Sequence, residues 1–344
     1  MAHVMEVIRI EGQSEGYKRW IKEGSSALRE RLPFKGPAHL AITIGSAGMD
    51  SLVDAMDFEK PPVEIPFEEI GLPVGENQNH PKMILAGVIK GGKNIIVVKG
   101  RTHEYEIRPT GISTETWGVL GPAELTTGYL GMLSQIGVEN MILTNAAGGI
   151  NHPLNDDEPK PYLIEDIPVI SLIESDVDLA FQNANLGHYK GEVGDFFSLK
   201  NPDEELMQIF RQSMLDIDEN MEIPTVHYAT SLSTPEFEDE TAIWMAAKFG
   251  TQAVGMSYSP EKQFLSGVKG IGRFIGISII TNLQELGYKD GREGDKAISV
   301  QELVSQRPGK FKKKFVASDA EVRENSKKVE KKLSMALAQL TRNL

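Results

Sequence analysis

Short apolar runs that end in Gly, Ser, Thr or Asn recur along the chain. They are rich in Val, Ile and Leu and show little alternation with polar residues. Near-continuous runs of this kind are typical of strands that are covered on both faces. We therefore expect strands within LAITIGS (40–46), NIIVVKGR (94–101), MILTNAAGG (141–149), AVGMS (253–257) and FIGISIITN (274–282).

Helix-like segments lie between these runs. AELTTGYLGMLSQIG (123–137) and ETAIWMAAKFG (240–250) each close with a helix-stopping Gly. Ser318 and Glu321 have the spacing of a capping box, which predicts a long amphipathic C-terminal helix over 319–343. The alternation of strands and helices predicts an α/β fold.

Three segments are polar or rich in Gly and Pro, at 152–162, 183–204 and 284–312, and we interpret them as loops or insertions. The chain has no internal repeat and no shift in composition that would mark a boundary. We therefore expect one domain over residues 1–344, with an insertion around 284–318.

The charge balance limits the classes of partner. The chain has 344 residues, a formal net charge of -13 and a pI of about 5.1, so it is a poor candidate for nucleic-acid or membrane-surface binding. Any anion site must depend on local positive charge. The absence of cysteine excludes disulfides and thiolate metal sites. No run resembles a secretory signal or a membrane span, so we expect a cytoplasmic protein.

The stretch GRTHEYE (100–106) follows one of the predicted strands. Arg101, His103 and Tyr105 alternate and would share one face if the extended conformation continued. A guanidinium can bind phosphate through two parallel hydrogen bonds, and an imidazole can donate beside it. This pattern favours an anion site, although Arg101 alone is more often in a surface ion pair and His103 alone is more often structural.

Other polar residues also follow predicted strands, where ligands of open α/β sheets collect. GSAGMD (45–50) offers backbone amides and a hydroxyl to an anion, and TNAAGGIN (144–151) lets the backbone pass close to a ligand. Either stretch could instead be a tight turn. IITN (279–282) ends a strand on a hydroxyl and an amide, which in isolation is usually a turn signal.

Two more stretches add surfaces suited to a planar, partly apolar ligand. Phe237 and Glu238 place an aromatic ring beside a carboxylate, just before a helix. Such a pair could stack on a flat ring and accept its N–H, or could be a core Phe beside a helix start. Met256 offers a soft apolar surface and Ser257 a further hydroxyl.

The order of these motifs resembles that of the trimeric, low-molecular-mass purine nucleoside phosphorylases, a family that includes methylthioadenosine phosphorylases. The resemblance covers roughly residues 38–282. It implies a single-domain phosphorylase/hydrolase-like fold with a central mixed sheet flanked by helices, and a homotrimer. It also implies a pentosyltransferase that converts a purine nucleoside and phosphate to free base and ribose 1-phosphate. Inorganic phosphate would be a co-substrate, with no metal and no other cofactor.

The resemblance also implies roles for individual residues. His103, Glu238 and Asn282 would be catalytic. The residues that would hold or border phosphate are Ser46, His80, Arg101, His103, Ala146 and Ser257. The residues that would bind the sugar or the base are Tyr105, Phe237, Glu238, Met256, Thr281 and Asn282.

The nature of the base is open to two interpretations. An Asn amide at 282, with Glu238, is compatible with a 6-oxopurine and favours guanosine or inosine, whereas methylthioadenosine is the alternative. A third possibility is a weakly catalytic protein that binds nucleoside or phosphate. It is motivated by Ile107, where the family usually has Gly, and by the absence of any His after His227.

Overall fold

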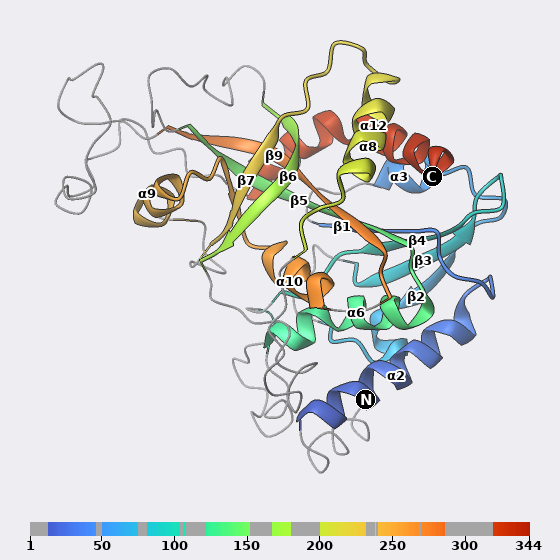
Figure 1. Ribbon diagram of the computed structural model, residues 1–344. Helices are drawn as coiled ribbons and strands as arrows, with labels where there is room; N and C mark the ends of the chain where they lie inside the picture. Colours follow the sequence, from blue (N-terminus) through green and yellow to red (C-terminus); the bar gives the residue numbers. More distant parts are fainter. Residues whose placement is uncertain are drawn as a thin grey trace, which may run out of the picture.

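The structure is a computed structural model (Figure 1). It describes residues 13–45, 50–74, 81–103, 106, 122–151, 167–179, 200–231, 238, 240–267, 270–285 and 319–344.

The described strands form one nine-stranded sheet in the order β2-β3-β4-β1-β5-β8-β7-β6-β9. Their bounds are Leu40–Ile44 (β1), Val63–Pro66 (β2), Met83–Val88 (β3), Asn94–Lys99 (β4), Asn140–Asn151 (β5), Val169–Asp178 (β6), Thr225–Thr230 (β7), Ala253–Gly255 (β8) and Arg273–Glu285 (β9). β9 pairs with both β6 and β5, so β5, β8, β7, β6 and β9 close into a ring of strands.

The sheet is mixed, as predicted. Three neighbouring pairs are parallel: β4–β1, β1–β5 and β5–β9. β2, β3 and β4 form an antiparallel meander, and the pairs β5–β8 and β6–β9 are also antiparallel. Because β4, β1, β5 and β9 share one direction, their carboxyl ends meet at one edge of the sheet. The residues that follow these strands are therefore brought together.

The five predicted strands are confirmed as β1, β4, β5, β8 and β9. The pattern did not identify β2, β3, β6 and β7. β2 has only four residues and ends on Pro66, which is tolerated at a sheet edge. The second half of β6, ESDVD, and the polar His227 within β7 interrupt the apolar pattern that marked the other strands.

The helices in the described part of the chain cover both faces of the sheet. Their bounds are Gln13–Arg31 (α2), Asp50–Ala55 (α3), Phe67–Ile70 (the 3-10 helix η1), Pro122–Ile136 (α6), Glu204–Leu215 (α8), Glu240–Lys248 (α9), Ser259–Gly267 (α10) and Asp319–Asn343 (α12). α6 and α9 confirm two predicted helices, and α12 spans the range predicted for the C-terminal one. Among these helices none is long and apolar enough to cross a membrane.

Two apolar cores lie on opposite faces of the sheet. α2, α6 and α10 cover one face, and α3, α8 and α12 cover the other (Figure 1). β1 contributes side chains to both cores: Ala41 belongs to the first core, whereas Leu40 and Ile42 belong to the second. Alternate residues of a strand point to opposite faces, so a strand buried on both sides needs apolar residues at most positions.

Some predictions lie outside the described residues. These are the loops at 152–162 and most of 183–204 and 284–312, together with the cap residue Ser318. β9 continues to Glu285, so the described strand overlaps the first two residues of the predicted insertion.

Candidate functional site

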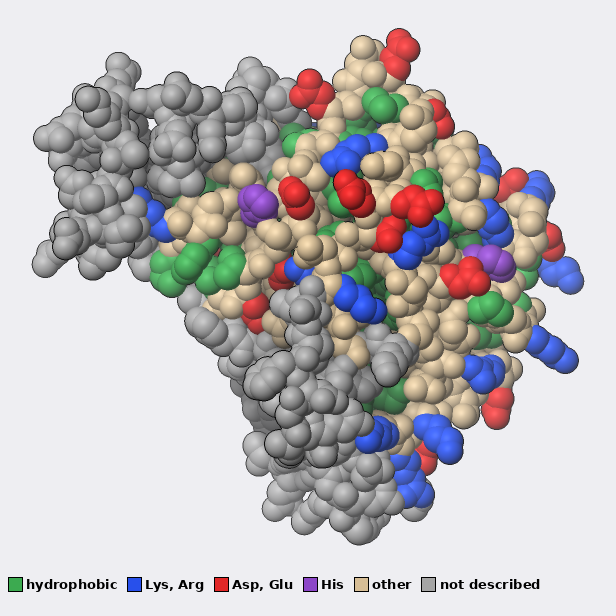
Figure 2. Space-filling model, in the orientation of Figure 1, with side chains coloured by type: hydrophobic (Ala, Val, Ile, Leu, Met, Phe, Trp, Pro, Cys, Tyr) green, Lys and Arg blue, Asp and Glu red, His purple; other side chains and the backbone are tan. Residues whose placement is uncertain are grey.

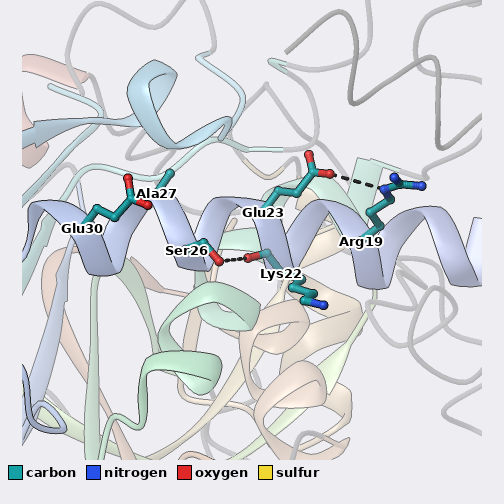
Figure 3. Close-up of a pocket in the computed structure, with 6 residues that line it drawn as sticks. All are labelled: Arg19, Lys22, Glu23, Ser26, Ala27 and Glu30. Atoms are coloured by element: carbon teal, nitrogen blue, oxygen red, sulfur yellow. Dashed lines mark hydrogen bonds and ion pairs between the residues drawn. The ribbon is translucent and has the colours of Figure 1, made fainter.

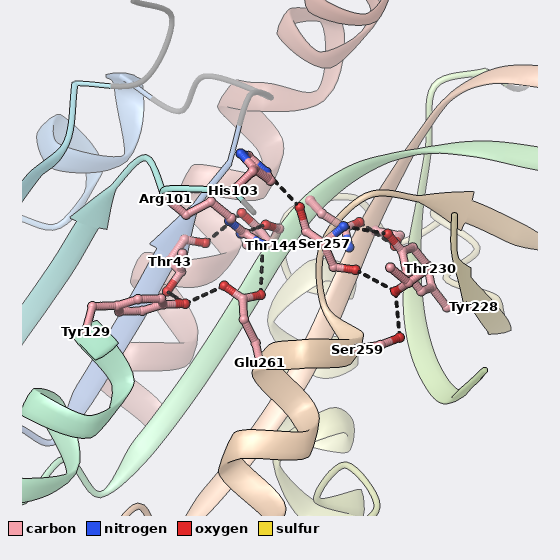
Figure 4. A network of polar contacts seen from close by, with 12 residues as sticks. Thr43, Arg101, His103, Tyr129, Thr144, Tyr228, Thr230, Ser257, Ser259 and Glu261 are labelled. Atoms are coloured by element: carbon pink, nitrogen blue, oxygen red, sulfur yellow. Dashed lines mark hydrogen bonds and ion pairs between the residues drawn. The ribbon is translucent and has the colours of Figure 1, made fainter. Parts of the chain in front are cut away.

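Polar side chains converge where the parallel strands end (Figure 4). Arg101, which follows β4, is only 3% exposed. Its Nη1 donates to Glu261 Oε2 at 2.8 Å, and its Nη2 donates to the backbone carbonyl of Thr144 in β5. The interpretation of Arg101 as a member of a surface ion pair is therefore wrong. The guanidinium is held inside the protein, in a buried ion pair, at the edge of the sheet.

Glu261 lies in the first turn of α10, where the helix dipole favours a carboxylate. Its Oε1 accepts a hydrogen bond from the Tyr129 hydroxyl at 2.5 Å, and Thr43 Oγ1 donates to that same hydroxyl at 3.2 Å. Burial and the neighbouring charge of Glu261 raise the pKa of Tyr129 well above its usual value. Tyr129 is therefore neutral and acts as a donor that fixes the carboxylate opposite Arg101.

His103 connects two motifs that are far apart in the sequence. Its Nε2 lies 3.2 Å from Ser257 Oγ, and its Nδ1 lies 2.9 Å from Glu106 Oε1 (Figure 4 shows the contact with Ser257). Two of the residues predicted to bind phosphate are thus in direct contact. Burial lowers the pKa of His103, and the nearby positive charges of Arg101 and Lys82 act in the same direction.

Glu106 and Lys82 form a second buried ion pair beside His103. Lys82 Nζ donates to Glu106 Oε2 at 2.8 Å and also donates to the backbone carbonyl of Arg101. Burial would raise the pKa of Glu106, but hydrogen bonds from His103 and Lys82 outweigh it and lower that pKa to about 2. Glu106 is therefore ionised and orients the imidazole ring.

Ser257 is held by the end of β7. Its backbone N–H donates to the Tyr228 hydroxyl at 3.4 Å, and its carbonyl accepts from Thr230 Oγ1 at 3.2 Å. The next residue, Tyr258, has a φ of 83°, and its ring packs edge-on against Tyr228 with centroids 5.7 Å apart. A left-handed conformation is rare for a bulky residue and is found at strained functional turns. This turn directs the Ser257 hydroxyl toward His103, and Met256 beside it is partly buried.

A bulge between β5 and β9 shapes the neighbouring part of the site. Ala147 pairs with Ile280 and Gly148 pairs with Asn282, so Thr281 is the additional residue in β9. Bulges re-aim the side chains that follow them. The Asn282 amide lies against Gly148, where a Cβ atom would be 3.2 Å from Nδ2. Gly148 therefore leaves room for this amide.

Glu238 and Ala146 were also predicted for the site, and both lie near β8. The partly buried Glu238 accepts a hydrogen bond from the Ser231 side chain, and burial raises the pKa of Glu238. The Ser231 backbone N–H in turn donates to the carbonyl of Gly255 at 2.7 Å. The carbonyl of Ala146 approaches the same glycine, at 3.3 Å from the position of an added Cβ.

Four predicted site residues lie outside the described part of the chain: Ser46, His80, Tyr105 and Phe237.

The sequence interpretation missed four residues that organise the site: Lys82, Glu106, Tyr129 and Glu261. Glu106 and Glu261 are within motifs that were recognised, and a signal for Glu106 was its spacing of three residues from His103. Lys82 and Tyr129 had no local signal, because their partners are distant in the sequence.

Comparison with known families decides the class of this fold and site. Residues 40–317 match the family model described as the phosphorylase superfamily. The chain belongs to the phosphorylase superfamily. The match includes every predicted site residue and all the described strands.

Relatives of this superfamily member are named as purine nucleoside phosphorylases. The chain is 26% identical to purine nucleoside phosphorylase 1 of Bacillus subtilis over 265 residues, which covers 76% of this chain and 84% of the relative. It is 26% identical to purine nucleoside phosphorylase of Bos taurus, covering 66% of this chain and 69% of the relative. These matches confirm the family resemblance and the expected enzyme class, a pentosyltransferase.

A solved structure confirms the fold. The structure of Schistosoma mansoni purine nucleoside phosphorylase in complex with inosine matches with a TM-score of 0.66 at 18% identity. The match covers 94% of this chain and 96% of that one. At this identity the likeness concerns the fold alone, which is the predicted central mixed sheet flanked by helices.

The phosphorylase-superfamily chain also has a shallow hollow of about 470 Å³ on α2, away from the site (Figure 3). Its described lining consists of Arg19, Lys22, Glu23, Ser26, Ala27 and Glu30. All six lie on one helix, and Arg19 pairs with Glu23 at 3.3 Å. This hollow lacks the convergence of several elements that the strand-end site has.

Proposed function

We propose that this protein catalyses the phosphorolysis of purine nucleosides, with guanosine or inosine preferred. The products are the free purine base and ribose 1-phosphate. Membership of the phosphorylase superfamily supports the reaction class. The observation that carries the proposal is the contact of His103 with Ser257 beside the buried guanidinium of Arg101. A hydroxyl, an imidazole and a cation in one place suit a tetrahedral oxyanion.

Phosphate would lie at this cluster, held by Arg101, His103, Ser257 and the backbone amide of Ala146. Ser46 and His80 would complete the phosphate site, as the sequence motifs imply. Breaking the glycosidic bond develops positive charge on the sugar. A phosphate fixed under the anomeric carbon stabilises that charge and then forms the new bond to carbon, so the protein acts by positioning and electrostatics.

The base would lie toward Glu238 and Asn282, with Phe237 and Thr281 beside it and Met256 and Tyr105 against the sugar. The departing purine gains negative charge as the bond breaks. Asn282 would donate a hydrogen bond to the imidazole part of the purine, and Glu238 would accept N–H protons from its other side. An amide at 282 suits a 6-oxopurine, and the solved relative from Schistosoma mansoni that shares this fold binds inosine.

Two alternatives concern the same site. Methylthioadenosine would replace a 6-oxopurine nucleoside if the Asn282 amide turned its carbonyl toward a 6-amino group. A weakly catalytic binding protein would keep the site without efficient turnover. We further propose a homotrimer that acts in the cytoplasm with inorganic phosphate as co-substrate and without a metal.

Product analysis separates these possibilities. The protein is incubated with inosine, guanosine, adenosine or methylthioadenosine, each with and without phosphate, and bases and sugar phosphates are quantified. We expect hypoxanthine or guanine, with ribose 1-phosphate, only when phosphate is present. Release of base at the same rate without phosphate would indicate hydrolysis and would refute the proposal. Fastest turnover of methylthioadenosine would refute the proposed base preference alone.

Removing the Glu238 carboxylate tests its proposed role. Glu238→Gln keeps the size of the side chain but loses the charged acceptor, so kcat/KM for inosine should fall by about 10²- to 10³-fold, as when one preorganised transition-state contact is lost. Steady-state kinetics measure this. The matched control is Glu205→Gln, because Glu205 is 75% exposed and pairs with Arg273 on α8's outer side. Near-normal turnover by Glu238→Gln would remove Glu238 from the mechanism.

A further inference from the structure

Lys82, which directly precedes β3, has an unusual backbone conformation. Its φ of 52° lies in the left-handed region, and only 3% of the residue is exposed. That conformation suits glycine and is uncommon for a residue with a long side chain. Residues that are held in it by their surroundings are frequent at functional sites. A role for the side chain would explain why a lysine occupies this position.

The Lys82 ammonium group contacts two parts of the strand-end site. Its Nζ donates to the backbone carbonyl of Arg101 and to both carboxylate oxygens of Glu106, at 3.1 Å for Oε1 and 2.8 Å for Oε2. An ammonium group has three N–H donors. The three acceptors match that number, so the geometry indicates that Lys82 acts on Arg101 and Glu106 rather than directly on a ligand.

Glu106 connects Lys82 to the place where an anion is proposed to bind. Its Oε1 accepts from the backbone N–H of His103 at 2.9 Å and lies 2.9 Å from Nδ1 of the same residue. Ser257 Oγ lies 3.2 Å from the other ring nitrogen, Nε2. The negative charge of Glu106 is therefore separated from the Ser257 hydroxyl by a single imidazole ring.

The buried ion pairs Lys82–Glu106 and Arg101–Glu261 contain equal numbers of positive and negative charges. Buried charges are screened only weakly by solvent and salt. Burial lowers the pKa of Lys82, whereas the contact with Glu106 acts in the opposite direction. Without the ammonium group, Glu106 would give these pairs an excess negative charge, and that charge would repel an incoming phosphate.

We propose that Lys82 is a positioning residue of the phosphate site: its ammonium group holds and neutralises Glu106, so that a phosphate dianion can bind beside His103. This inference rests on the proposed function, in which phosphate is the anion bound here. Lys82 acts on the anion through Glu106. The proposed base-binding residues Glu238 and Asn282 lie near β8 and in β9, so binding of the nucleoside should depend on Lys82 much less.

Calorimetric titration of the full chain with inorganic phosphate at neutral pH tests the sign of the effect. Lys82→Met keeps an unbranched side chain but removes the charge, so phosphate should bind about 10- to 100-fold more weakly. Glu106→Gln removes the opposing negative charge, and its amide oxygen can still accept from His103. This variant should therefore bind phosphate at least as tightly as the unaltered protein. The double variant Lys82→Met/Glu106→Gln loses both charges, and its affinity should return toward that of the unaltered protein.

Lys90→Met is the matched control, because it changes the net charge of the chain equally at a lysine side chain that is 70% exposed. It should leave the affinity for phosphate unchanged. A purely structural role of the Lys82–Glu106 pair would instead weaken phosphate binding in both single variants and in the double variant. Weaker binding by Glu106→Gln would overturn the proposal, even if Lys82→Met failed to fold. A double variant as weak as Lys82→Met would also overturn it.

Steady-state kinetics give a second readout. Lys82→Met should raise KM for phosphate by about 10- to 100-fold and change KM for inosine little, whereas equal increases in both would contradict the proposal. The two hypotheses fail separately. The expected order of phosphate affinities without turnover of any nucleoside contradicts the proposed function alone. Phosphorolysis by a Lys82→Met protein that binds phosphate normally contradicts this inference alone.

Discussion

Two buried cations, Arg101 and Lys82, depend on the carboxylates that neutralise them. Lys82 and Glu106 each expose only 3% of their side chains. Burial of a lone charge is costly, but a pair with additional hydrogen bonds is tolerated. The additional donors and acceptors are present here, since Tyr129 donates to the carboxylate beside Arg101. At the scale of residues, the site is therefore a set of compensated charges.

Glu261→Gln should destabilise the protein strongly, because it removes the carboxylate that pairs with the buried Arg101 guanidinium at 2.8 Å. We expect a loss of about 3–5 kcal/mol in the free energy of unfolding. Urea titration measures this. Asp57→Asn is the control, since Asp57 pairs with Lys90 on the surface and its φ of 49° suits Asn. Lys90 exposes 70% of its side chain and Asp57 exposes 52%. Loss of this pair should lower the free energy of unfolding by about 0–1 kcal/mol. Equal losses would contradict this.

Acid should weaken the fold through Glu106 and His103. The pKa of Glu106 is about 2 in the folded protein against an ordinary 4.5, so its contribution is complete above about pH 4.5 and is lost toward pH 2. His103 also has a lowered pKa, so its contribution begins to fall below its ordinary 6.5. Glu238 has a raised pKa, so its contribution to the free energy of unfolding increases as the pH falls and partly offsets these losses.

The measurement is a series of urea titrations between pH 7 and the lowest pH at which the folded state persists. Stability should decrease as the pH falls. Glu106→Gln should be less stable than the unaltered protein at neutral pH, and its stability should change less below pH 4.5 because the titrating carboxyl is gone. Parallel pH profiles for the two proteins would show that Glu106 does not contribute in this way.

At the scale of elements, the site depends on close contact between α10 and the strands beneath it. Tyr258, at the turn into α10, packs its ring over Gly276 of β9. A Cβ atom at 276 would lie 2.3 Å from Tyr258 Cε2. Lys262 on α10 also forms an ion pair with Asp176 of β6 at 2.5 Å, and both side chains are 5% exposed. These contacts fix the turn that carries Ser257.

Gly276→Ala should therefore displace Tyr258 and disturb the turn. Overpacking of this kind is expected to reduce stability by about 1–3 kcal/mol. Gly36→Ala is a suitable control, because its nearest neighbour to an added Cβ is the Asn94 side chain at 3.5 Å and its φ is not in the left-handed region. Thermal unfolding of both variants checks this. A Gly276→Ala protein as stable as Gly36→Ala would show that the turn can adapt.

Across the whole molecule, α12 links the second core to the strand-end site. It packs on α3, α8 and β9 and contributes Leu333 and Leu337 to the second core (Figure 1). Asn325 Nδ2 donates to the carbonyl of Thr281 at 2.7 Å, next to the predicted base-binding Asn282. The C-terminal helix therefore supports the bulge in β9 as well as the core.

The described surface supports the expectation that positive charge for an anion is local. On the face shown in Figure 2, Lys and Arg side chains lie among Asp and Glu side chains. The chain as a whole has a net charge of -13. The cations at the strand ends, Arg101 and Lys82, are buried, where their charges are screened less by solvent and salt.

Substitutions along α12 test its contribution to the core. Leu337 is fully buried and Met335 is 41% exposed on the same helix. Leu337→Ala should lower the free energy of unfolding by about 2–5 kcal/mol, because it removes buried methyl groups and leaves a cavity. Met335→Ala, as the matched control, should change stability by about 0.5 kcal/mol or less. Chemical denaturation compares them, and similar effects would contradict the assigned packing of α12.

Strands with a long apolar run, such as β1 and β4, could be predicted, although β3, which is equally apolar (MILAGV), was not identified. Both β1 and β4 are largely buried, so most of their side chains are apolar and the pattern is visible locally. β7 could not be recognised in this way, because His227 is exposed at one sheet position while Tyr228 beside it is buried. Whether a polar residue is compatible with a strand depended on neighbours elsewhere in the chain.

The chain's own motifs were enough to indicate an α/β fold, a place for an anion after β4 and the family to which the protein belongs. They were enough because apolar runs and glycine-rich turns consist of consecutive residues and can be recognised without the folded structure. The partners of Arg101 and His103 required the folded molecule, since Glu261 and Ser257 lie 160 and 154 residues away along the chain. Charge compensation and hydrogen bonding depend on which side chains are neighbours in space. Spacing along the sequence does not specify those neighbours.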